Sequence, residues 1–447
     1  MRIRKLQLKN IGVFDLEEIE FKPSKSNDKA EIHILTGANG SGKSTILIAL
    51  AGAFDHFQFD TPQHPSNNLH KRFRYFDYFD GEKSSANCKS GFTVSFDDKE
   101  RVEVVGDPRT NYAHTYKTIE KVKAYRNIII SSAKPTVALD YAVFAYSGYR
   151  HIESNEIVSI GTSSNTNPFL DSLEFVKHKN QSNGLTINNW IADSISKSAV
   201  EKERNPEKSK KFASAVKSLE STIAEITGWK VEFDLRTDPF DLRLKLNNQD
   251  LDFDVLPDGL RSLISWIGDL LMRVDSLKWN DELPAFEKNL ILFLDEIEVH
   301  LHPEWQRKVL PVVQKLFKNS QIFLSTHSPF VVNSVDGAWV YKLGLENGKA
   351  KLESVIESRT TESYETVLRK IFGIGEQFGQ ETQNQLDKFY EQKDAILSGQ
   401  SVNEKAFLKL AKKLADKSVR DENVLLKNII IFELKQLNKI TGKTYEI

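Results

Sequence analysis

The stretch Gly37–Ser44, GANGSGKS, decides the fold of this 447-residue chain. It matches the pattern G-x-x-x-x-G-K-[ST] in full, and it stands between an apolar run, AEIHILTG, and a run with helical character, STILIALAGAF. In that context glycines let the backbone wrap around a phosphate group, and the amides at the start of the helix supply partial positive charge. The stretch therefore predicts a nucleotide-phosphate site at the end of a buried strand.

The residue types in this loop suit phosphate chemistry. The ammonium group of Lys43 is expected to reach the β- and γ-phosphates, and the hydroxyl of Ser44 is expected to be a ligand of Mg²⁺. ATP and Mg²⁺ are therefore the expected ligands. The expected binding set consists of Gly37, Ala38, Asn39, Gly40, Ser41, Gly42, Lys43, Ser44 and Thr45.

Two acidic residues follow a second apolar run, and a histidine follows a third. In NLILFLDE the acidic residues are Asp295 and Glu296, and in FLSTHSP the histidine is His327. We expect Asp295 to hold Mg²⁺ directly or through water, and Glu296 to be the general base that polarises the attacking water, an effect of about 10²–10⁴-fold. His327 is expected to form a hydrogen bond with the γ-phosphate. Acidic residues at strand ends and histidines in loops are common by themselves. These assignments therefore depend on the presence of the P-loop, Gly37–Ser44, in the same chain.

Apolar strands alternate with helices along the chain, which is typical of an α/β fold with a mainly parallel sheet. The runs WKVEFDLR, FDLRLKL and LDFDV predict additional antiparallel strands, the last two joined by a turn at NNQD. We expect a first domain over residues 1–357 and a helical C-terminal extension over residues 358–447. Within the first domain we expect an irregular insertion at about 55–90 and a helical insert at about 161–228.

Composition excludes several classes of protein. The formal net charge of −1 gives no global attraction to nucleic acid or membranes, so any basic surface must be local. The one cysteine, Cys88, excludes an intrachain disulfide framework and a cysteine-rich zinc site. No apolar run approaches the roughly 20 residues of a membrane span. The start, MRIRKLQLKN, has no apolar run of a secretory signal behind it, so a cytoplasmic protein is expected.

The P-loop, LFLDE, HLHP and STHSP, in this order, resemble the motifs of ATP-binding-cassette (ABC) ATPases of the SMC, Rad50, RecF and OLD type. The resemblance covers most of the first 345 residues. It implies a P-loop ABC-ATPase head with a mainly parallel central sheet, an antiparallel β lobe, a helical insert and a helical C-terminal extension. It also implies two heads in a head-to-tail sandwich, in which each ATP contacts the P-loop of one head and the signature loop of the other.

The resemblance gives a role to LPDGLRS, Leu256–Ser262, because a signature helix in this family begins with L-S-x-G. Asp258 and Gly259 are therefore expected to face the phosphates of the partner's ATP from a helix N-terminus. Pro257 stands in place of the usual serine and removes a hydroxyl and a backbone N–H, and Asp258 adds negative charge unless it caps its own helix. We expect weaker contact in trans and slow or regulated hydrolysis. The expected apolar stripe of the helix is Leu260, Leu263, Ile264, Ile267, Leu271 and Val274.

Two further loops are placed by the resemblance. The resemblance implies a glutamine in the loop after YAVFAYSGYR, but the sequence has no convincing one there. Ser147 or Tyr149 stands in its place. The segment EVHLHP is expected to cross the dimer interface, with Glu298 and His302 as candidates for contacts. The His-x-His spacing in it also suits a metal site, but the rest of a ligand set is missing.

The C-terminal extension lacks the residues of a nuclease. It has no D-x-D, and every histidine lies at or before His327. The nearest acidic cluster, DLDFD, fits the exposed face of a strand. A compact ATPase with LPDGL, a helical tail and no nuclease of its own most resembles the ATPase subunit of the Septu anti-phage system, and similar retron-associated proteins. That resemblance implies a separate HNH-type nuclease subunit as partner, and self-assembly.

Several alternatives remain open. The apolar stripes of the tail suit packing onto the head as well as docking of a partner or a second copy. The basic stretches LHKRFRYF and EKSKK fit a solvated face better than a DNA contact, so nucleic acid is expected mainly through the complex. A stand-alone ATPase in DNA repair or DNA loading is the second hypothesis. A transporter motor is the third, and the long interval between Ser44 and Asp295 argues against it.

Overall fold

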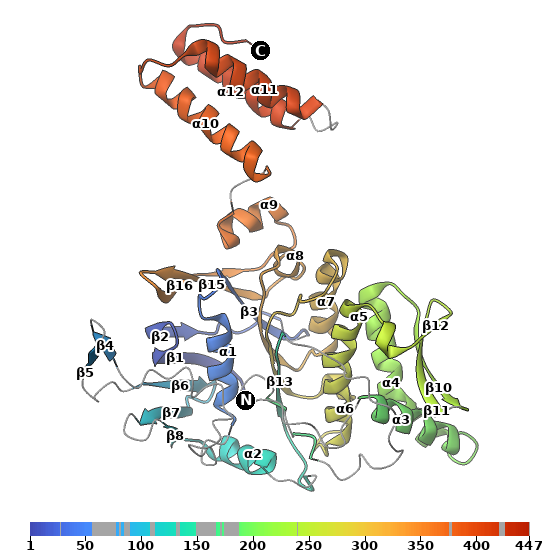
Figure 1. The fold of residues 1–447 in the computed structure, drawn as a ribbon. Helices are drawn as coiled ribbons and strands as arrows, with labels where there is room; N and C mark the ends of the chain where they lie inside the picture. Colours follow the sequence, from blue (N-terminus) through green and yellow to red (C-terminus); the bar gives the residue numbers. More distant parts are fainter. Residues whose placement is uncertain are drawn as a thin grey trace. The chain divides into compact units, whose positions relative to one another are not determined.

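The computed structural model describes residues 1–26, 28–55, 77–79, 82–84, 90–107, 112–130, 135–148, 167–169, 172–173, 187–238, 240–374, 378–419 and 425–446. The chain forms two compact units, Met1–Phe372 and Gly373–Ile447 (Figure 1). The division follows Phe372 and not residue 357, because the segment between them packs on the first unit. The Ser358 hydroxyl donates to the carbonyl of Val335, and Val367 and Ile371 belong to the core of that unit.

The first unit is built on a six-stranded sheet. Five strands are parallel, and β16 joins the edge as the antiparallel arm of a hairpin. This confirms the expected α/β fold with a mainly parallel central sheet. In order across the sheet, the strands are β16 (Lys349–Glu357), β15 (Trp339–Glu346), β3 (Glu31–Gly37), β14 (Gln321–Ser325), β13 (Leu290–Leu294) and β9 (Ala142–Tyr146).

Helices cover the central sheet, which explains why its inner strands are apolar throughout. All residues of β9, β13 and β14 are buried. Helix α1 (Lys43–Gly52) packs against β3, β13 and β14. Figure 1 shows α6 (Asp269–Ser276) and α7 (Pro303–Leu316) on the other side of these strands. Since the strands are parallel, the segments that follow β3, β9, β13 and β14 meet at one edge of the sheet.

A second, antiparallel sheet supplies the expected β lobe. Its five strands include β6 and β7, which pair antiparallel along GFTVSF and RVEVV. Helix α2 (Glu120–Ile130) follows the last strand. The strands are, in order, β2 (Phe14–Glu20), β1 (Ile3–Ile11), β6 (Gly91–Phe96), β7 (Arg101–Asp107) and β8 (Tyr112–Lys117).

The insertion expected at about 55–90 lies largely outside the described residues. Its described part includes a short hairpin, β4 (Asp77–Phe79) and β5 (Glu82–Ser84), so the segment is not irregular throughout. Arginine, lysine and aromatic residues of LHKRFRYF, and Cys88, lie outside the described residues.

The helical insert contains α3 (Ile187–Glu201) and α4 (Pro206–Thr227). Residues 161–166, 170–171 and 174–186 of the expected insert lie outside the described residues. The connection between the two helices is short. Helix α4 begins directly after Asn205, whose side chain caps it by accepting a hydrogen bond from the backbone N–H of Lys208.

A three-stranded sheet follows: β10 (Val231–Thr237), β11 (Phe240–Leu246) and β12 (Gln249–Leu251). Asn247 and Asn248, at φ 48° and 70°, make the expected tight turn. The expected strand LDFDV is wrong beyond Leu251, because the chain turns into a 3₁₀ helix, η4 (Phe253–Val255), and the ring of Phe253 stacks on Phe233. The acidic cluster DLDFD therefore does not lie on one continuous strand.

The helix predicted after Pro257 runs from Asp258 to Ser276 in three segments. A π-helical turn, η5 (Ile264–Gly268), separates α5 (Asp258–Leu263) from α6 (Asp269–Ser276). Every residue of the expected apolar stripe is buried. Shorter elements complete the unit: η6 (Ala285–Glu287), α8 (Pro329–Val332), α9 (Tyr364–Val367) and η7 (Leu368–Phe372).

The second unit is a group of three helices: α10 (Gln380–Leu397), α11 (Glu404–Val419) and α12 (Leu425–Thr441). The apolar stripes predicted for this part bury one another, with Phe389 stacked on Phe407 at their centre. Leu425, Phe432 and Ile440 of α12 stay exposed.

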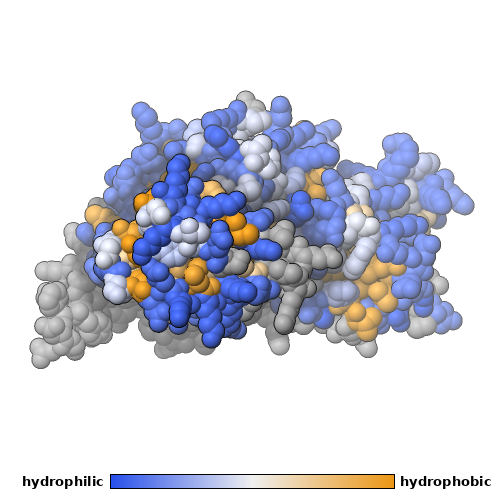
Figure 2. Space-filling model, turned by 90° about the horizontal axis from the view of Figure 1, so that it is seen from above, coloured by the Kyte–Doolittle hydropathy of each residue, from blue (hydrophilic) through white to orange (hydrophobic). Residues whose placement is uncertain are grey.

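Figure 2, which shows the molecule from above, has hydrophobic residues in small separate groups on a mostly hydrophilic surface. Among the described residues, no helix has both the length and the apolar character that a membrane span requires.

Candidate active site

The P-loop lies where β3 runs into α1. Gly37, Gly40 and Gly42 have positive φ angles of 146°, 81° and 91°. A Cβ atom on Gly37 would stand 2.2 Å from the carbonyl oxygen of Leu343, and one on Gly42 would stand 2.3 Å from the ring of Phe14. At Gly40 nothing lies within 4 Å, so the middle of the loop is open. Two of the glycines are thus required by close packing, and the third faces free space.

The first turn of α1 has amides for an anion. Gly42, the N-cap residue, provides no side-chain cap, and no acidic residue lies in the first turn. The hydroxyl of Ser41 is closed off from solvent and has no hydrogen-bond partner among the described residues. Ala38, Asn39 and Gly40 are exposed, whereas Thr45 is buried. The uncapped amides at the start of α1 and the Ser41 hydroxyl are donors that fit a bound phosphate chain.

Lys43 is folded back onto its own loop. Its Nζ donates to the carbonyl oxygens of Gly37 (2.9 Å) and Ala38 (3.0 Å). Burial lowers the pKa of Lys43, and the nearby carboxylates of Asp295, Glu296 and Glu298 oppose this shift. The ammonium group therefore lies in the field of three carboxylates.

The acidic pair follows β13, one strand away from β14, and Ser325 at the end of β14 fixes it. The Ser325 hydroxyl donates to Oδ1 of Asp295 and accepts the backbone N–H of Glu296 at 2.8 Å. Glu296 has a φ of 48°, which a non-glycine residue rarely adopts. Such strain persists where the surroundings over-determine it, and it is frequent at functional sites. Ser325, a residue that the sequence reasoning missed, lies in the quoted motif STHSP.

His327 follows β14 at the same edge. Its backbone N–H donates to Oε1 of Glu298 at 2.5 Å. Burial lowers the pKa of His327, and Lys43 lowers it further, while Glu298, Glu296 and Asp295 oppose the shift. The structure thus brings the P-loop lysine, the acidic pair and the histidine into one electrostatic cluster.

Gly148 is the second residue that the sequence reasoning missed. β9 pairs with β13 so that Tyr146 lies beside Leu294, and the loop after β9 therefore runs past the acidic pair. A Cβ atom on Gly148 would stand 3.0 Å from Oε2 of Glu296. Ser147 lies in this loop, and Tyr149 lies outside the described residues.

The expected signature loop starts α5. The expected possibility that Asp258 caps its own helix is wrong. Its side chain forms no cap, and its Oδ1 instead accepts a hydrogen bond from Nη2 of Arg261 at 2.6 Å. Gly259 is held in contact with the EVHLHP loop, because a Cβ there would stand 2.6 Å from the carbonyl oxygen of His300. Asp258 itself is largely exposed.

The other two interface candidates have partners within the chain. Nδ1 of His302 accepts the backbone N–H of Glu304 at 3.3 Å and so caps α7. Glu298 accepts the backbone N–H of His327, as described above. Within the described ranges, no group of three or more histidine, cysteine, aspartate or glutamate side chains is arranged to hold a metal ion.

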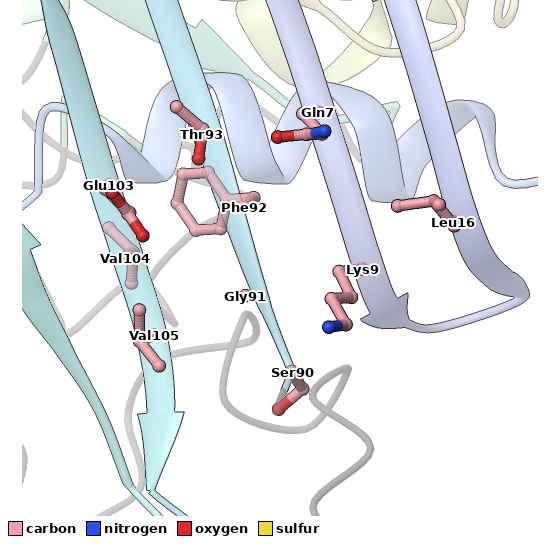
Figure 3. A pocket seen from close by; sticks show the side chains of 10 residues that line it. All are labelled: Gln7, Lys9, Leu16, Ser90, Gly91, Phe92, Thr93, Glu103, Val104 and Val105. Atoms are coloured by element: carbon pink, nitrogen blue, oxygen red, sulfur yellow. The ribbon is translucent and has the colours of Figure 1, made fainter. Parts of the chain in front are cut away.

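A cavity of about 390 Å³ lies along strands β1, β2, β6 and β7, and Figure 3 shows residues that line it, such as Gln7, Lys9 and Glu103. None of the P-loop residues, the acidic pair or His327 belongs to its lining. This cavity is therefore separate from the residues that meet at the strand-end edge of the central sheet.

ATP and Mg²⁺ fit the residues at that edge. The glycine loop leaves open space at Gly40, the N-terminus of α1 is uncapped, and the buried Ser41 hydroxyl lacks a partner among the described residues. Ser44 and Asp295 supply the hydroxyl and carboxylate oxygens that Mg²⁺ prefers.

The chain is similar to known ATPases. The model of the family described as AAA ATPase domain matches residues 1–332. Among curated relatives, the retron Vc95 probable ATPase of Vibrio cholerae is 24% identical over 74% of this chain and 72% of the relative. The Septu protein PtuA of Bacillus thuringiensis is 22% identical over 77% of this chain and 76% of the relative. The retron Ec83 probable ATPase of Escherichia coli is 36% identical, but the match spans 25% of this chain and only 20% of that relative.

Solved structures are also similar. An SMC head bound to the C-terminal winged-helix domain of ScpA matches with a TM-score of 0.47 and 14% identity, over 81% of this chain and 98% of that one. The SMC head domain from Thermotoga maritima matches with a TM-score of 0.42 and 13% identity, over 80% and 100%. The family model covers well over half of the chain, and the chain therefore belongs to the AAA ATPase domain family.

Proposed function

We propose that the chain binds ATP with Mg²⁺ and hydrolyses it to ADP and phosphate. The observation that carries this proposal is the meeting of Lys43, the Asp295–Glu296 pair and His327 at one edge of the sheet, with Ser325 fixing the pair. These residues come from three separate segments of the chain, the P-loop, the end of β13 and the end of β14, and a chance glycine-rich turn would not gather them.

In this proposal the P-loop amides and Lys43 bind the β- and γ-phosphates, and Ser44 and Asp295 hold Mg²⁺. When bound, Mg²⁺ neutralises charge on the phosphate oxygens. Glu296, which Ser325 and Gly148 hold in place, accepts a hydrogen bond from the attacking water and takes its proton. Since burial and Lys43 lower the pKa of His327, a neutral imidazole can form a hydrogen bond with the γ-phosphate.

Two copies complete the site in this proposal. The start of α5, where Asp258 is exposed and Gly259 is buried, approaches the phosphates bound to the partner, head to tail. The pairing of Asp258 with Arg261 reduces, but does not remove, the negative charge there. Slow or regulated hydrolysis follows from this charge and from the missing N–H of Pro257.

We further propose that the chain is the ATPase subunit of a prokaryotic anti-phage defence complex and regulates a separate HNH-type nuclease. The support comes from its similarity to the Septu protein PtuA of Bacillus thuringiensis and to the retron Vc95 probable ATPase, each over about three quarters of the chain. Further support is the sequence of the C-terminal unit, which contains no histidine and no cysteine. In this proposal the second unit, Gly373–Ile447, serves partner docking or self-assembly, and nucleic acid is contacted mainly through the complex.

The test is the native mass of the tagged chain, co-expressed with its genomic neighbours, with and without Mg-ATP. A stable complex with a small nuclease supports the regulated-nuclease function, and removal of residues after Phe372 then tests docking by the second unit. A chain that only dimerises with ATP contradicts that function and favours a stand-alone ATPase acting on DNA. Turnover of ATP, measured on the same samples and lost in Glu296→Gln, tests the hydrolysis step separately.

A further inference from the structure

The loop after β13 carries a third carboxylate, Glu298, which lies within the cluster around Lys43 and His327. Oε1 of Glu298 accepts the backbone N–H of His327 at 2.5 Å. Its other oxygen, Oε2, is closed off from solvent and has no hydrogen-bond partner among the described residues. Glu298 therefore turns inward, toward the loop after β14, and not outward toward a partner.

The Glu298 carboxylate anchors the backbone of His327. The neighbours of His327 have anchors of their own: the N–H of Thr326 donates to the carbonyl of Leu35 at 3.1 Å, and the N–H of Ser328 donates to Oγ1 of Thr326 at 3.0 Å. The N–H of His327 donates to Glu298 alone. Loss of the carboxylate would leave this one peptide of the loop without its hydrogen bond.

The backbone around Glu298 is held in an unusual shape. Glu296 and His300, on either side of it, have φ angles of 48° and 64°. The N–H of Leu301 donates to the carbonyl of Glu298 at 2.9 Å, which closes the turn. Two residues with positive φ so close together indicate that the backbone of Glu298 is held by a well-defined turn.

We propose that Glu298 is a positioning residue for ATP hydrolysis: by accepting the backbone N–H of His327, it holds the imidazole in place relative to Glu296 and Lys43. This role rests on the proposed ATPase function. The expected contact of Glu298 across the dimer stays a separate prediction.

The same loop also touches the start of α5. A Cβ on Gly259 would stand 2.6 Å from the carbonyl oxygen of His300, two residues after Glu298. A displacement of α5 by a second copy would therefore press on the loop that holds His327. Glu298 in this way links the expected trans contact at Asp258 to the histidine in cis.

The test compares Glu298→Ala with Glu298→Gln, because glutamine keeps an oxygen that can accept the N–H of His327. Glu304→Ala, an exposed glutamate on the first turn of α7, is the matched control. Two quantities are measured on the full chain: steady-state kcat and KM for ATP, and amide hydrogen exchange of the peptide that contains His327, without nucleotide. We expect Glu298→Ala to lower kcat by about 10–100-fold with KM within about twofold, as small misplacements at an active site do, and to speed exchange. Glu298→Gln should retain both properties to within about threefold.

Three outcomes overturn the proposal. Faster exchange in Glu298→Ala with unchanged kcat shows that the hydrogen bond exists but does not serve hydrolysis. Equal losses in Glu298→Gln and Glu298→Ala show that charge, and not the hydrogen bond, is what matters. A wild-type chain with no turnover rejects the proposed ATPase function, and this role with it, and the exchange result then separates that failure from a wrong assignment of the hydrogen bond.

Discussion

Gly148 lies directly against the side chain of Glu296: a Cβ atom on Gly148 would stand 3.0 Å from Oε2 and 3.3 Å from Cβ of that glutamate. Both distances are tighter than an ordinary van der Waals contact, so the glutamate must move if residue 148 gains a side chain. The absence of a side chain at this position thus keeps the general-base candidate in its place.

Gly148→Ala should lower kcat for ATP by about tenfold or more, because a shift of Glu296 by a few tenths of an ångström disturbs the geometry of the attacking water. Binding of ATP should change little, since the three atoms nearest to the new Cβ all belong to Glu296 and none to the P-loop. Gly379→Ala is the control, because a Cβ at Gly379 meets nothing within 4 Å. Steady-state kinetics decide, and an unchanged kcat in Gly148→Ala would remove Gly148 from the site.

The contact between Gly148 and Glu296 also marks the limit of what the sequence predicts. The P-loop, the acidic pair and His327 were accessible because each follows its own apolar strand within a short motif. Gly148 is near Glu296 only because β9 pairs with β13 in one register, and a local pattern carries no information about that pairing. Ser325 and the cis role of Glu298 depend in the same way on the pairing of β13 with β14.

The fold shows the same division between local and distant information. Strands and helices with a clear apolar period were predicted, including the buried stripe of α5 and α6. The π-helical turn at Ile264–Gly268 was not, because the apolar spacing of the stripe passes through it without a break. The early end of β12 was missed because Phe253 fits an alternating strand, although its ring packs on Phe233 after a turn.

Lys43→Met should abolish stabilisation by ATP. The Lys43 ammonium group is expected to bind the β- and γ-phosphates, and methionine keeps the unbranched side chain up to its fourth atom without the charge. At a ligand concentration of about 100 times Kd, wild-type protein gains roughly 2.7 kcal/mol of unfolding free energy, and the variant should gain almost none. Thermal unfolding with and without Mg-ATP measures this difference. Equal shifts in both proteins would mean that nucleotide binds elsewhere.

Glu296→Gln should separate binding from hydrolysis. Glutamine preserves the size of the side chain but cannot take a proton from water, so kcat should fall by about 10²–10⁴-fold while the Kd for ATP stays within about threefold. The ATP-dependent dimer should persist longer in this variant, which native mass measurements over time can follow. A variant that turns over ATP at the wild-type rate would show that another group is the base.

The stability of the first unit should depend on Glu31 in acid. Burial works to raise the pKa of Glu31, but hydrogen bonds and charge from His33 and Arg4 outweigh it and lower that pKa from 4.5 to about 2. A carboxyl whose folded-state pKa is lowered contributes stability above about pH 4.5, and this stability is lost as the pH falls toward 2.

Chemical denaturation between pH 6 and pH 2.5 tests this expectation. The advantage of wild type over Glu31→Gln should shrink in this range by up to about 3 kcal/mol, since one pKa unit corresponds to about 1.4 kcal/mol. Glu304→Gln, at an exposed position, should instead follow wild type in parallel. A constant difference between wild type and Glu31→Gln would show that the hydrogen bonds of Glu31 matter and its charge does not.

The charge at the start of α5 should control assembly with ATP. Asp258 pairs with Arg261 at 2.6 Å, and its side chain is 68% exposed, so a carboxylate faces the proposed position of the partner's phosphates. Asp258→Asn removes this charge at constant size and should tighten the ATP-dependent dimer by about 1 kcal/mol, roughly fivefold in Kd, the scale of one charge pair at about 4 Å in water. Arg261→Gln should act in the opposite direction, because it leaves the carboxylate without its partner.

Both effects should weaken as salt rises from 50 to 500 mM, since screening shortens the range of exposed charges. Sedimentation of the Glu296→Gln background with Mg-ATP measures the dimer without turnover, and shifts of the same sign in both variants would place the phosphates away from Asp258.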